Sequence, residues 1–511
     1  MSANVQLYAA TVLLVVAYGI VRRLRKRRRA SFPPGPRPYP LIGNLRDIPS
    51  EAPWKTFAKW SEQYGDMVYF HTLGREVVVL NSATMAHDLL DKRSAKYSYR
   101  PFFAMASEVI GWKWALPIMD YGEKWKRHRK YLQQFFHKQN IPKYYNIELK
   151  EVHHLLNDFL DDPENFTAHI KRLAGGVTMM LTYGHEVKSL EDPFIRVAEK
   201  GVLTIEAVGA VGAHVVDFVP WIRHLPDWFP GAVIKRLPPG TREDLHDFLH
   251  KPFNYVKERL AQGTAVPCYT TTLLEETKGN DDEGIRGTAA ITYAGMPFHT
   301  LSALMTAMIA LVADPAIQMR AQEEMDSVIG KDRLPTFEDR ARLPYMHSII
   351  TETLRYLFDA YFCVPHRLSQ DDEYGGYCLP ANCVVIANTW AMLYDPRVYP
   401  EPHKFNPDRF FNKEGGIIQP DPRGPAFGFG RRVCPGKDLA ETHLWITIAS
   451  MFYAFKITPA VDESGKEIPI DLEFSEHSIR QCIRRHPKPF KCIIKPRRAN
   501  SASLIRHAKD N

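Results

Sequence analysis

One decapeptide near the C-terminus decides the fold, and it reads Phe427-Gly-Phe-Gly-Arg-Arg-Val-Cys434-Pro-Gly436. Gly428 and Gly430 permit backbone angles and close approaches that a side chain would block. The loop can therefore wrap around a flat cofactor and direct backbone N–H groups at the Cys434 sulfur. A helix that begins near Gly436 adds the positive end of its dipole, which favours the thiolate form of Cys434 over the thiol.

This loop resembles the haem-binding loop of the cytochrome P-450 family, and it matches at Phe427, Gly430, Arg432, Cys434 and Gly436. The resemblance implies haem b as the cofactor, with the iron ligated axially by the Cys434 thiolate and with Arg432 in reach of a haem carboxylate. Thiolate ligation pushes electron density onto the iron and favours O–O cleavage. A buried structural cysteine in a glycine turn is the alternative interpretation.

Two further motifs resemble haem contacts of the same family. Trp125 and Arg129 stand at positions i and i+4 of an expected helix, so they share one face. In the family such a pair contacts a haem propionate. His366 stands where the family has an arginine or histidine that hydrogen-bonds a propionate, and a histidine in a surface turn is its alternative interpretation.

Three charged residues resemble the structural triad of the family. Glu352 and Arg355 are i,i+3 neighbours in a helical pattern, and Arg409 follows in Phe405-Asn-Pro-Asp-Arg409-Phe410. A buried ion pair needs further hydrogen bonds to offset its desolvation. We expect Arg409 to contribute to these bonds and the triad to support the cysteine loop, without a part in catalysis.

A central segment of 26 residues, Thr288 to Ala313, contains no Asp, Glu, Lys or Arg, and Asp314-Pro315 ends it. Its length would suit a transmembrane helix. The residues Pro297 and His299, with several Thr and Ser residues, favour a helix buried within the protein. It resembles the long helix that crosses above the haem in the family.

That helix usually carries an acid and then a threonine, which relay protons to bound oxygen. Here the sequence is Ala294-Gly-Met-Pro-Phe-His-Thr300, and neither possible alignment recovers the pair. One alignment replaces the acid and threonine with Phe298 and His299, and the other with Pro297 and Phe298. The predicted catalytic residues are therefore His299 and Thr300, which with water would deliver protons, because imidazole titrates near neutrality.

Alternatives to this prediction stay open. The enzyme could be a redox-neutral haem-thiolate isomerase or dehydratase, because family members of that kind often lack the threonine. It could also be a non-catalytic haem protein. His299 itself could be a hydrogen-bonded histidine of the core.

The substrate pocket is expected in four regions that the resemblance locates: Pro101 to Trp114, Ala290 to Thr300, Phe358 to Val364, and Ser475 to Arg480. Its lining should be apolar and aromatic, which suits a lipophilic ring system. The expected contacts are Phe102, Phe103, Ile110, Trp112, Phe298, Tyr361 and Phe362, although such aromatics can equally belong to the core.

The N-terminus predicts a membrane anchor. Val5 to Val21 is uncharged over 17 residues, and seven cations follow directly between Arg22 and Arg29. A cleaved signal peptide has the opposite order, so retention is favoured, and the positive-inside rule leaves the body in the cytosol. Phe32-Pro-Pro-Gly-Pro-Arg-Pro-Tyr-Pro40 resembles the proline hinge of microsomal family members. A nuclear-localisation run is the alternative for the cations.

Composition restricts the remaining possibilities. The formal net charge is +8, and the seven cations of the basic collar account for all but +1 of it, which argues against a nucleic-acid partner. The seven cysteines are scattered and odd in number, which fits a reducing compartment. We expect an anchor (1–21), a collar and hinge (22–44), one haem-thiolate catalytic domain (45–498) and a polar tail (499–511).

The resemblance extends from Phe32 to about Pro496 and implies a mainly α fold with a smaller β region, in addition to the N-terminal transmembrane helix. The stretches Leu225-Pro-Asp-Trp-Phe-Pro-Gly231 and Ala387-Asn-Thr-Trp390 resemble fungal enzymes of secondary metabolism. The implied protein is a single-pass monooxygenase of the endoplasmic reticulum membrane that oxidises a lipophilic small molecule. It would use O2 and electrons that NADPH–cytochrome P-450 reductase supplies, because the chain has no Gly-rich dinucleotide loop.

Overall fold

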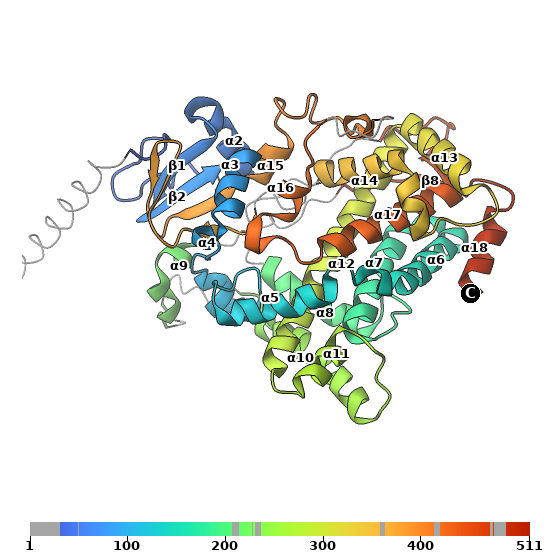
Figure 1. Cartoon of the computed structure of the whole chain (residues 1–511), viewed down its shortest axis with the longest axis horizontal. Helices are drawn as coiled ribbons and strands as arrows, with labels where there is room; N and C mark the ends of the chain where they lie inside the picture. The colour runs from blue at the N-terminus through green and yellow to red at the C-terminus, as the bar shows by residue number, and fades with distance from the viewer. Residues whose placement is uncertain are drawn as a thin grey trace, which may run out of the picture.

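The computed structural model describes residues 31–49, 51–206, 214–226, 228–229, 237–357, 363–412, 419–470, 474 and 487–510. Most of them are helical (Figure 1). The helices are α2 (Pro53–Tyr64), α3 (Ala83–Ala86), α4 (Ser94–Tyr97), α5 (Glu123–Phe136), α6 (Tyr145–Asp161), α7 (Phe166–Tyr183), α8 (Pro193–Glu206), α9 (Val215–Phe218), α10 (Thr241–Ala261), α11 (Tyr269–Thr277), α12 (Asp282–Ala313), α13 (Pro315–Ile329), α14 (Pro344–Leu357), α15 (Thr389–Leu393), α16 (Arg423–Phe427), α17 (Lys437–Ala454) and α18 (Ser501–Asp510).

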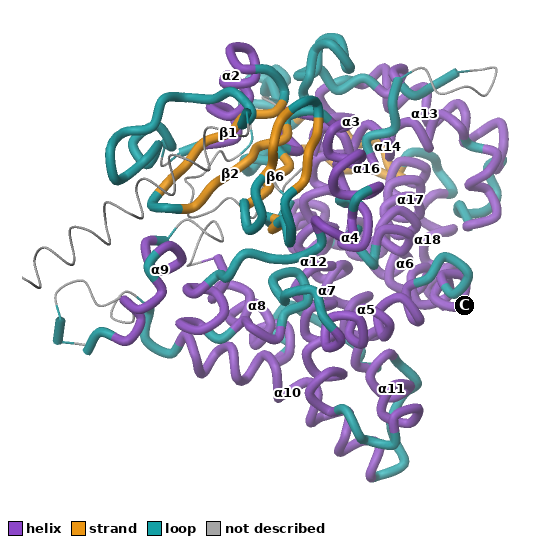
Figure 2. Tube along the Cα trace, turned by 60° about the vertical axis from the view of Figure 1, so that its left-hand side comes forward, coloured by secondary structure: helices purple, strands orange, loops and turns teal. Residues whose placement is uncertain are grey.

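The strands form one four-stranded sheet and two sheets of two strands each. They are β1 (Met67–Thr72), β2 (Arg75–Leu80), β3 (His366–Arg367), β4 (Asp372–Tyr374), β5 (Tyr377–Leu379), β6 (Val384–Ala387), β7 (Phe455–Pro459) and β8 (Cys492–Pro496). The larger sheet has the order β1-β2-β6-β3, with β2 and β6 parallel and the other pairs antiparallel. It lies at one side of the molecule, while helices make up most of the rest (Figure 2).

Alternation along the strands gives the larger sheet two apolar faces. Val78 and Val385 pack into one cluster with Leu89 and Leu90, which follow α3. Val79 packs into another cluster on the α2 side. The sheet is thus buried on both faces, which explains the continuous apolar run of β2.

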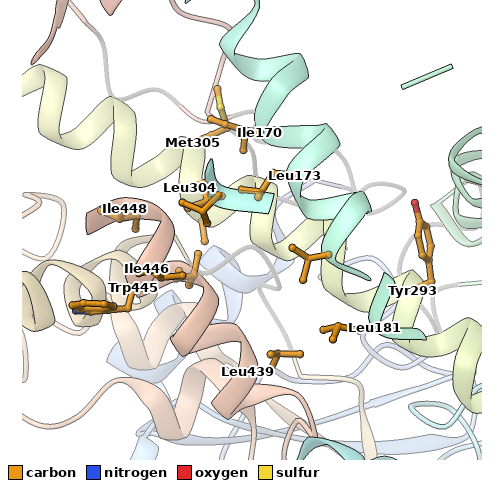
Figure 3. Close-up of a cluster of buried hydrophobic side chains, with 14 of the residues drawn as sticks. Ile170, Leu173, Leu181, Tyr293, Leu304, Met305, Leu439, Trp445, Ile446 and Ile448 are labelled. Atoms are coloured by element: carbon orange, nitrogen blue, oxygen red, sulfur yellow. The ribbon is translucent and has the colours of Figure 1, made fainter. Parts of the chain in front are cut away.

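The main core lies between the long helices. Leu304 and Met305 of α12 pack with Leu173 of α7 and with Leu439 and Ile446 of α17 (Figure 3). All five side chains are buried. Helix α12 therefore runs through the centre of the helical part, and α17, which directly follows the cysteine loop, is fixed against it.

Helix α12 confirms the buried central helix and extends it by one and a half turns. It begins at Asp282, where the Asp281 side chain accepts a hydrogen bond from Gly284 N–H and caps the helix. Among the described residues it is the one helix long and apolar enough to cross a membrane, but 72% of its most apolar window is buried in the protein. The helix continues through Pro297. The proposed anchor, Val5 to Val21, lies outside the described residues.

The C-terminal segment adds a helix that the sequence did not suggest. Within the tail 499–511, α18 packs on α6 through Ile505, which is completely buried. The Asn157 side chain donates a hydrogen bond to the Ile505 carbonyl at 3.2 Å. Before the helix, Arg497 makes two hydrogen bonds to Asp326 of α13, at 2.8 Å and 2.7 Å.

Candidate cofactor site

The cysteine loop lies between α16 and α17, and its glycines have a steric reason. Gly430 has a φ of +56°, and a Cβ built on it would lie 2.2 Å from the Leu90 carbonyl oxygen. Gly428 also has a positive φ, of +83°. The Cys434 N–H donates to the Phe427 carbonyl at 2.8 Å, which closes the loop. Phe427 is half-buried against the main core, and Gly436 caps α17.

Cys434 is half-buried, and the charge state of its thiol reflects opposing influences. Burial raises the pKa of the Cys434 thiol, while a hydrogen bond from the Gly436 N–H and the nearby Arg129 guanidinium lower it. Burial outweighs these two influences, although the hydrogen bond from the loop acts in the expected direction, toward the thiolate. A cation bound at the sulfur would be needed to stabilise the thiolate, because metal ligation requires the deprotonated form.

The predicted pair on α5 lies beside this loop. Arg129 donates from Nη1 to the Val433 carbonyl at 2.6 Å, one residue before Cys434. Its Nε atom and the indole Nε1 of Trp125 are buried and have no hydrogen-bond partner in the part of the chain that the structure describes. Both side chains are more than nine-tenths buried. Since a buried donor without an acceptor is costly, these two atoms indicate an acceptor that belongs to a bound molecule.

Arg432 presents a third unpartnered donor at the same place. Its guanidinium lies 4.5 Å from the Trp125 ring centroid. Its Nε donates to the Ser98 carbonyl at 2.8 Å, and its Nη2 is buried without a partner. Burial, with Arg129 also close, lowers the pKa of Arg432 to about 10.

Arg100 is a further buried cation beside these residues, and sequence reasoning missed it. It is buried and donates to the carbonyl oxygens of Pro117 at 2.7 Å and Val364 at 2.6 Å. Burial, with the neighbouring charge of Arg432, places the pKa of Arg100 well below its ordinary value. No local motif marks Arg100, because its acceptors come from segments far away in the sequence.

His366 lies in β3 and is buried against the same cations. Its Nδ1 lies 2.7 Å from the Tyr97 carbonyl oxygen, so Nδ1 carries the proton and donates it there. Burial and the charge of Arg100 hold the pKa of His366 well below its ordinary value. The structure corrects the alternative of a surface histidine.

Among the described residues, Arg100, Arg129 and Arg432 make hydrogen bonds to carbonyl oxygens but no ion pair with a carboxylate. Three guanidinium groups thus lie together in surroundings that disfavour their charge, and two of them, Arg129 and Arg432, have a donor without a partner among the described residues. Buried charges are usually paired. This arrangement fits an anionic ligand, and carboxylates suit it because guanidinium binds them with good geometry.

The two predicted catalytic residues lie in α12 but face different ways. His299 is exposed, whereas Thr300 is buried. Consecutive residues of a helix point about 100° apart, so the two side chains do not share a face. Ala294, Gly295 and Phe298 are half-buried. Pro297 has no N–H, so the Tyr293 carbonyl lacks its usual helical donor.

The expected substrate contacts divide into two groups. Phe103, Ile110 and Trp112 are at most 3% exposed, which favours the alternative that these aromatic and aliphatic side chains belong to the core. Trp112 instead donates from Nε1 to the Thr204 hydroxyl at 2.9 Å. Phe102 is 44% exposed and borders a cavity of about 400 Å³. Tyr361, Phe362 and the region Ser475 to Arg480 lie outside the described residues.

The comparisons with known proteins agree with this site. A family model described as Cytochrome P450 matches residues 33–480. The fungal protein "Cytochrome P450 monooxygenase claR" of Ampulloclitocybe clavipes is 36% identical over 487 residues, which cover 95% of this chain and 90% of the relative. "Cytochrome P450 monooxygenase 208" of Postia placenta is 36% identical over 97% of this chain and 96% of the relative. "Cytochrome P450 monooxygenase COX2" of Coprinopsis cinerea is 35% identical over 97% and 95%.

The chain therefore belongs to the cytochrome P450 family, and these relatives are fungal. Their names support a haem-thiolate monooxygenase, which is an oxidoreductase, as the class of this enzyme. The family implies a haem whose iron has a thiolate ligand. The residues present fit that group, because haem carries carboxylates and the unpartnered donors of Trp125, Arg129 and Arg432 need acceptors.

Proposed function

We propose that this protein is a membrane-anchored haem-thiolate monooxygenase that oxidises a lipophilic small molecule in fungal secondary metabolism. The observation that carries the proposal is the meeting of Cys434 with three buried donors that lack acceptors, on Trp125, Arg129 and Arg432. The kinship with fungal monooxygenases such as claR and COX2 supports the biological setting.

The roles of the side chains follow from this geometry. Bound haem b would supply the oxidising chemistry, and the protein supplies its binding and orientation. Cys434 ligates the iron, while Trp125, Arg129 and Arg432 hold the carboxylates, with His366 and Arg100 beside them. Phe427, Gly430 and Gly436 shape the loop so that the cysteine meets a flat ring.

Proton delivery on the distal side is proposed for His299 with Thr300. An exposed imidazole exchanges protons with water near neutral pH, and His299 stands in the stretch of α12 where the family has its acid and threonine. In this scheme His299 takes a proton from solvent and passes it through water toward the buried Thr300.

The electron donor in this proposal is NADPH–cytochrome P-450 reductase, a separate flavoprotein. The support is the sequence itself, which contains the haem loop but no glycine-rich dinucleotide loop. The two proteins would meet at the cytosolic face of the endoplasmic reticulum membrane, the proposed location.

Exposed apolar side chains support a membrane location beside the proposed anchor. Leu41 is 95% exposed, Trp221 63% and Trp228 76%. Trp is enriched where a protein meets the interface of a bilayer. These residues belong to two segments, 39–45 and 215–229, which flank the end of the larger sheet.

The two segments are connected through the turn between β1 and β2. Gly43, close to Leu41 in sequence, forms a bridge with Thr72. Arg75, the register partner of Thr72, lies over the Phe218 ring at 5.3 Å from its centroid. The exposed apolar side chains therefore gather at one end of the molecule, the end at which the described chain begins.

The experiment that tests the proposed function compares metabolites after deletion of the gene in its native host. We expect the accumulated compound to lack one oxygen, or to carry two more hydrogens, relative to the lost product. The purified enzyme should then convert that compound only with NADPH, O2 and the reductase. Conversion without them would overturn the proposal.

One observation favours a second candidate, a redox-neutral haem-thiolate isomerase or dehydratase. In one of the two possible alignments, Pro297 and Phe298 stand where the family has residues that support O2 activation, and neither can relay a proton. If this candidate holds, the accumulated compound and the lost product are isomers or differ by water, and turnover proceeds in the absence of NADPH.

A further inference from the structure

Arg423 and Glu441 form an ion pair across the two ends of the cysteine loop. Arg423 begins α16, which precedes the loop, and Glu441 lies in the second turn of α17, which follows it. The Arg423 Nε lies 3.2 Å from the Glu441 Oε1, and the two side chains are 28% and 14% exposed. Because partly buried charges are screened less than surface charges, the pair attracts the two helices toward each other.

The Arg423 guanidinium is oriented by two further partners. Its Nη1 donates to the Asp421 carboxylate, and its Nη2 donates to the Nε2 of His347 in α14, both at 2.8 Å. A guanidinium is only a donor, so Nε2 is the unprotonated nitrogen of His347. Helix α14 contacts both α16 and α17 (Figure 2). The cation that faces Glu441 is therefore fixed by the helical core and not by the ion pair alone.

Glu441 is also held from a second side. The Arg340 Nη2 donates to its Oε2 at 3.5 Å, and the Arg340 Nη1 donates to the Thr442 hydroxyl at 3.2 Å. Arg340 belongs to the 3-10 turn Phe337–Arg342. Each oxygen of the Glu441 carboxylate thus faces a different guanidinium, and the first turns of α17 are fixed in two directions.

The loop between the two helices needs such support because of its own composition. Gly428 and Gly430 both have a positive φ, and glycine has more conformational freedom than any other residue. The hydrogen bond from Cys434 N–H to the Phe427 carbonyl closes the loop from inside. It does not set the distance between α16 and α17, on which the place of the sulfur also depends.

We propose that Arg423 and Glu441 are a positioning pair, which keeps the Cys434 sulfur at the haem iron by holding the two ends of the loop together. The inference rests on the proposed function for the identity of the bound group. Neither residue acts on the haem directly, and both act through the loop. Loss of the pair lets the ends of the loop separate, so the thiolate leaves the iron more readily.

Spectra of the full-length, haem-loaded protein test this proposal. The reduced, carbon monoxide-bound form has a red-shifted Soret band only while the thiolate is bound. Decay of that band in urea, below the concentration that unfolds the protein, therefore measures loss of the ligand. In Glu441→Gln we expect decay about fivefold faster than in the wild type, with the same haem content.

Lys171→Ala is the matched control. It breaks another partly buried ion pair, between Lys171 of α7 and Glu199 of α8, which are 40% and 33% exposed. This variant should leave the decay of the band unchanged. Decay in Glu441→Gln as slow as in the wild type would overturn the proposal. So would a decay rate that follows the loss of global stability in every variant, Lys171→Ala included.

A double-mutant cycle tests whether the two residues act through their mutual contact. Arg423→Gln alone should also speed the decay, and it serves if Glu441→Gln does not fold. Adding it to Glu441→Gln should speed the decay little beyond the faster single variant, because the contact is already lost. Additive effects would refute a joint role.

The spectrum of the wild type separates this proposal from the proposed function. A wild type without the red-shifted band would refute the ligand assignment and this proposal together. A band that is present but decays equally fast in the wild type and in both single variants would refute the positioning pair alone. The measurement needs no turnover, so a redox-neutral enzyme would give the same result.

Discussion

Arg355 donates two hydrogen bonds to the carboxylate of Glu352, at 2.7 Å and 2.8 Å, and neither side chain is exposed to solvent. The remaining polar atoms of the pair also have partners. Glu352 accepts the Asn406 N–H at 2.8 Å, and Arg355 donates to the Leu393 carbonyl at 2.9 Å. Arg409 approaches Glu352 at 3.5 Å. The pair thus connects α14 with the segments around Leu393 and Asn406. The sequence predicted the ion pair, but its further hydrogen bonds come from these two segments and not from Arg409, whose Nε has no hydrogen-bond partner among the described residues.

Breaking this pair should destabilise the folded protein. In Glu352→Gln the guanidinium of Arg355 keeps its burial but loses its counter-charge, and we expect a loss of about 3–5 kcal/mol in the free energy of unfolding. Urea denaturation followed by circular dichroism measures it. Lys150→Ala, which breaks an exposed ion pair with Glu186, should cost less than about 1 kcal/mol. Equal effects of the two variants would contradict a structural role for Glu352.

The unpartnered indole of Trp125 gives a prediction that separates cofactor binding from stability. Trp125→Phe removes the Nε1–H donor but leaves a ring beneath Arg432, so we expect haem to be lost about tenfold faster or more. Transfer of haem to apomyoglobin measures the rate. The stability of the haem-free protein should not fall, because the lost donor has no protein acceptor.

Trp445→Phe is the matched control for Trp125→Phe. The Trp445 Nε1 is also buried and has no partner among the described residues, but Trp445 lies on α17 beside Ile446 (Figure 3). In the described part of the chain it makes no hydrogen bond or cation–π contact with Arg129 or Arg432. Its replacement should leave haem transfer unchanged. Faster haem loss in both variants would mean that general loosening of the core, and not a contact of Trp125 with haem, explains the result.

Buried histidines predict a loss of stability in weak acid. Burial lowers the pKa of His443 from 6.5 to about 4. Below pH 6.5 the imidazole of His443 binds a proton in the unfolded chain, whereas in the folded protein it stays neutral until the pH approaches about 4. The contribution of neutral His443 to the free energy of unfolding is therefore complete above pH 6.5 and is lost as the pH falls toward about 4. His128 should act in the same way and window.

Replacement of His443 tests this pH dependence. His443→Leu should reduce the slope of unfolding free energy against pH between 6.5 and 4, by up to about 1.4 kcal/mol per pH unit. Both ring nitrogens of His443 lack partners, so the substitution should not cost stability at pH 7. Denaturation curves measured at several pH values, with equal haem content in the variant and the wild type, give the free energy of unfolding and hence the slope. His246→Gln, at an exposed site, should leave the slope unchanged, and an identical slope in His443→Leu would contradict the explanation.

The C-terminal helix should contribute to global stability. A chain that ends at Asn500 loses α18 and the burial of Ile505, which we expect to cost about 2 kcal/mol or more. A thermal unfolding scan measures the difference. Arg506→Ala removes an exposed ion pair with Asp161 and a hydrogen bond to Asn157 but keeps α18, and should cost less stability than the truncation. A truncated chain as stable as the wild type would show that α18 is a dispensable tail.

Sequence reasoning succeeded where a functional group is encoded by neighbours in the chain. The loop around Cys434 is contiguous, and Trp125 and Arg129 are one helical turn apart, so spacing alone brings them together. Helix α12 was predicted because a long run without charged residues fits either a membrane or the core of a protein. In each case the physical constraint acts over a few residues.

The same reasoning failed where distant segments meet. Arg100 has acceptors from residues 117, 364 and 365, and no local pattern signals such a set. Trp112 is aromatic, as residues that line pockets often are, yet its indole N–H donates a hydrogen bond to Thr204. Hydrophobicity alone does not distinguish a core residue from a residue that lines a cavity. The tail was expected to be merely polar, although Ile505 can anchor it.

His299 of helix α12 gives a functional prediction. If His299 delivers protons, His299→Ala should lower the product formed per NADPH consumed while haem content stays the same. A companion variant, Phe298→Asp with His299→Thr, restores an acid and an alcohol and should recover coupling. Measured coupling that is unchanged in His299→Ala would remove His299 from the mechanism.

The central claim is that Cys434 ligates haem iron as a thiolate. The most direct measurement is the absorption spectrum of the reduced, carbon monoxide-bound protein, for the wild type and for Cys434→Ala. We expect the red-shifted Soret band of thiolate-ligated haem in the wild type and its complete loss in Cys434→Ala. A band that persists in Cys434→Ala would contradict it.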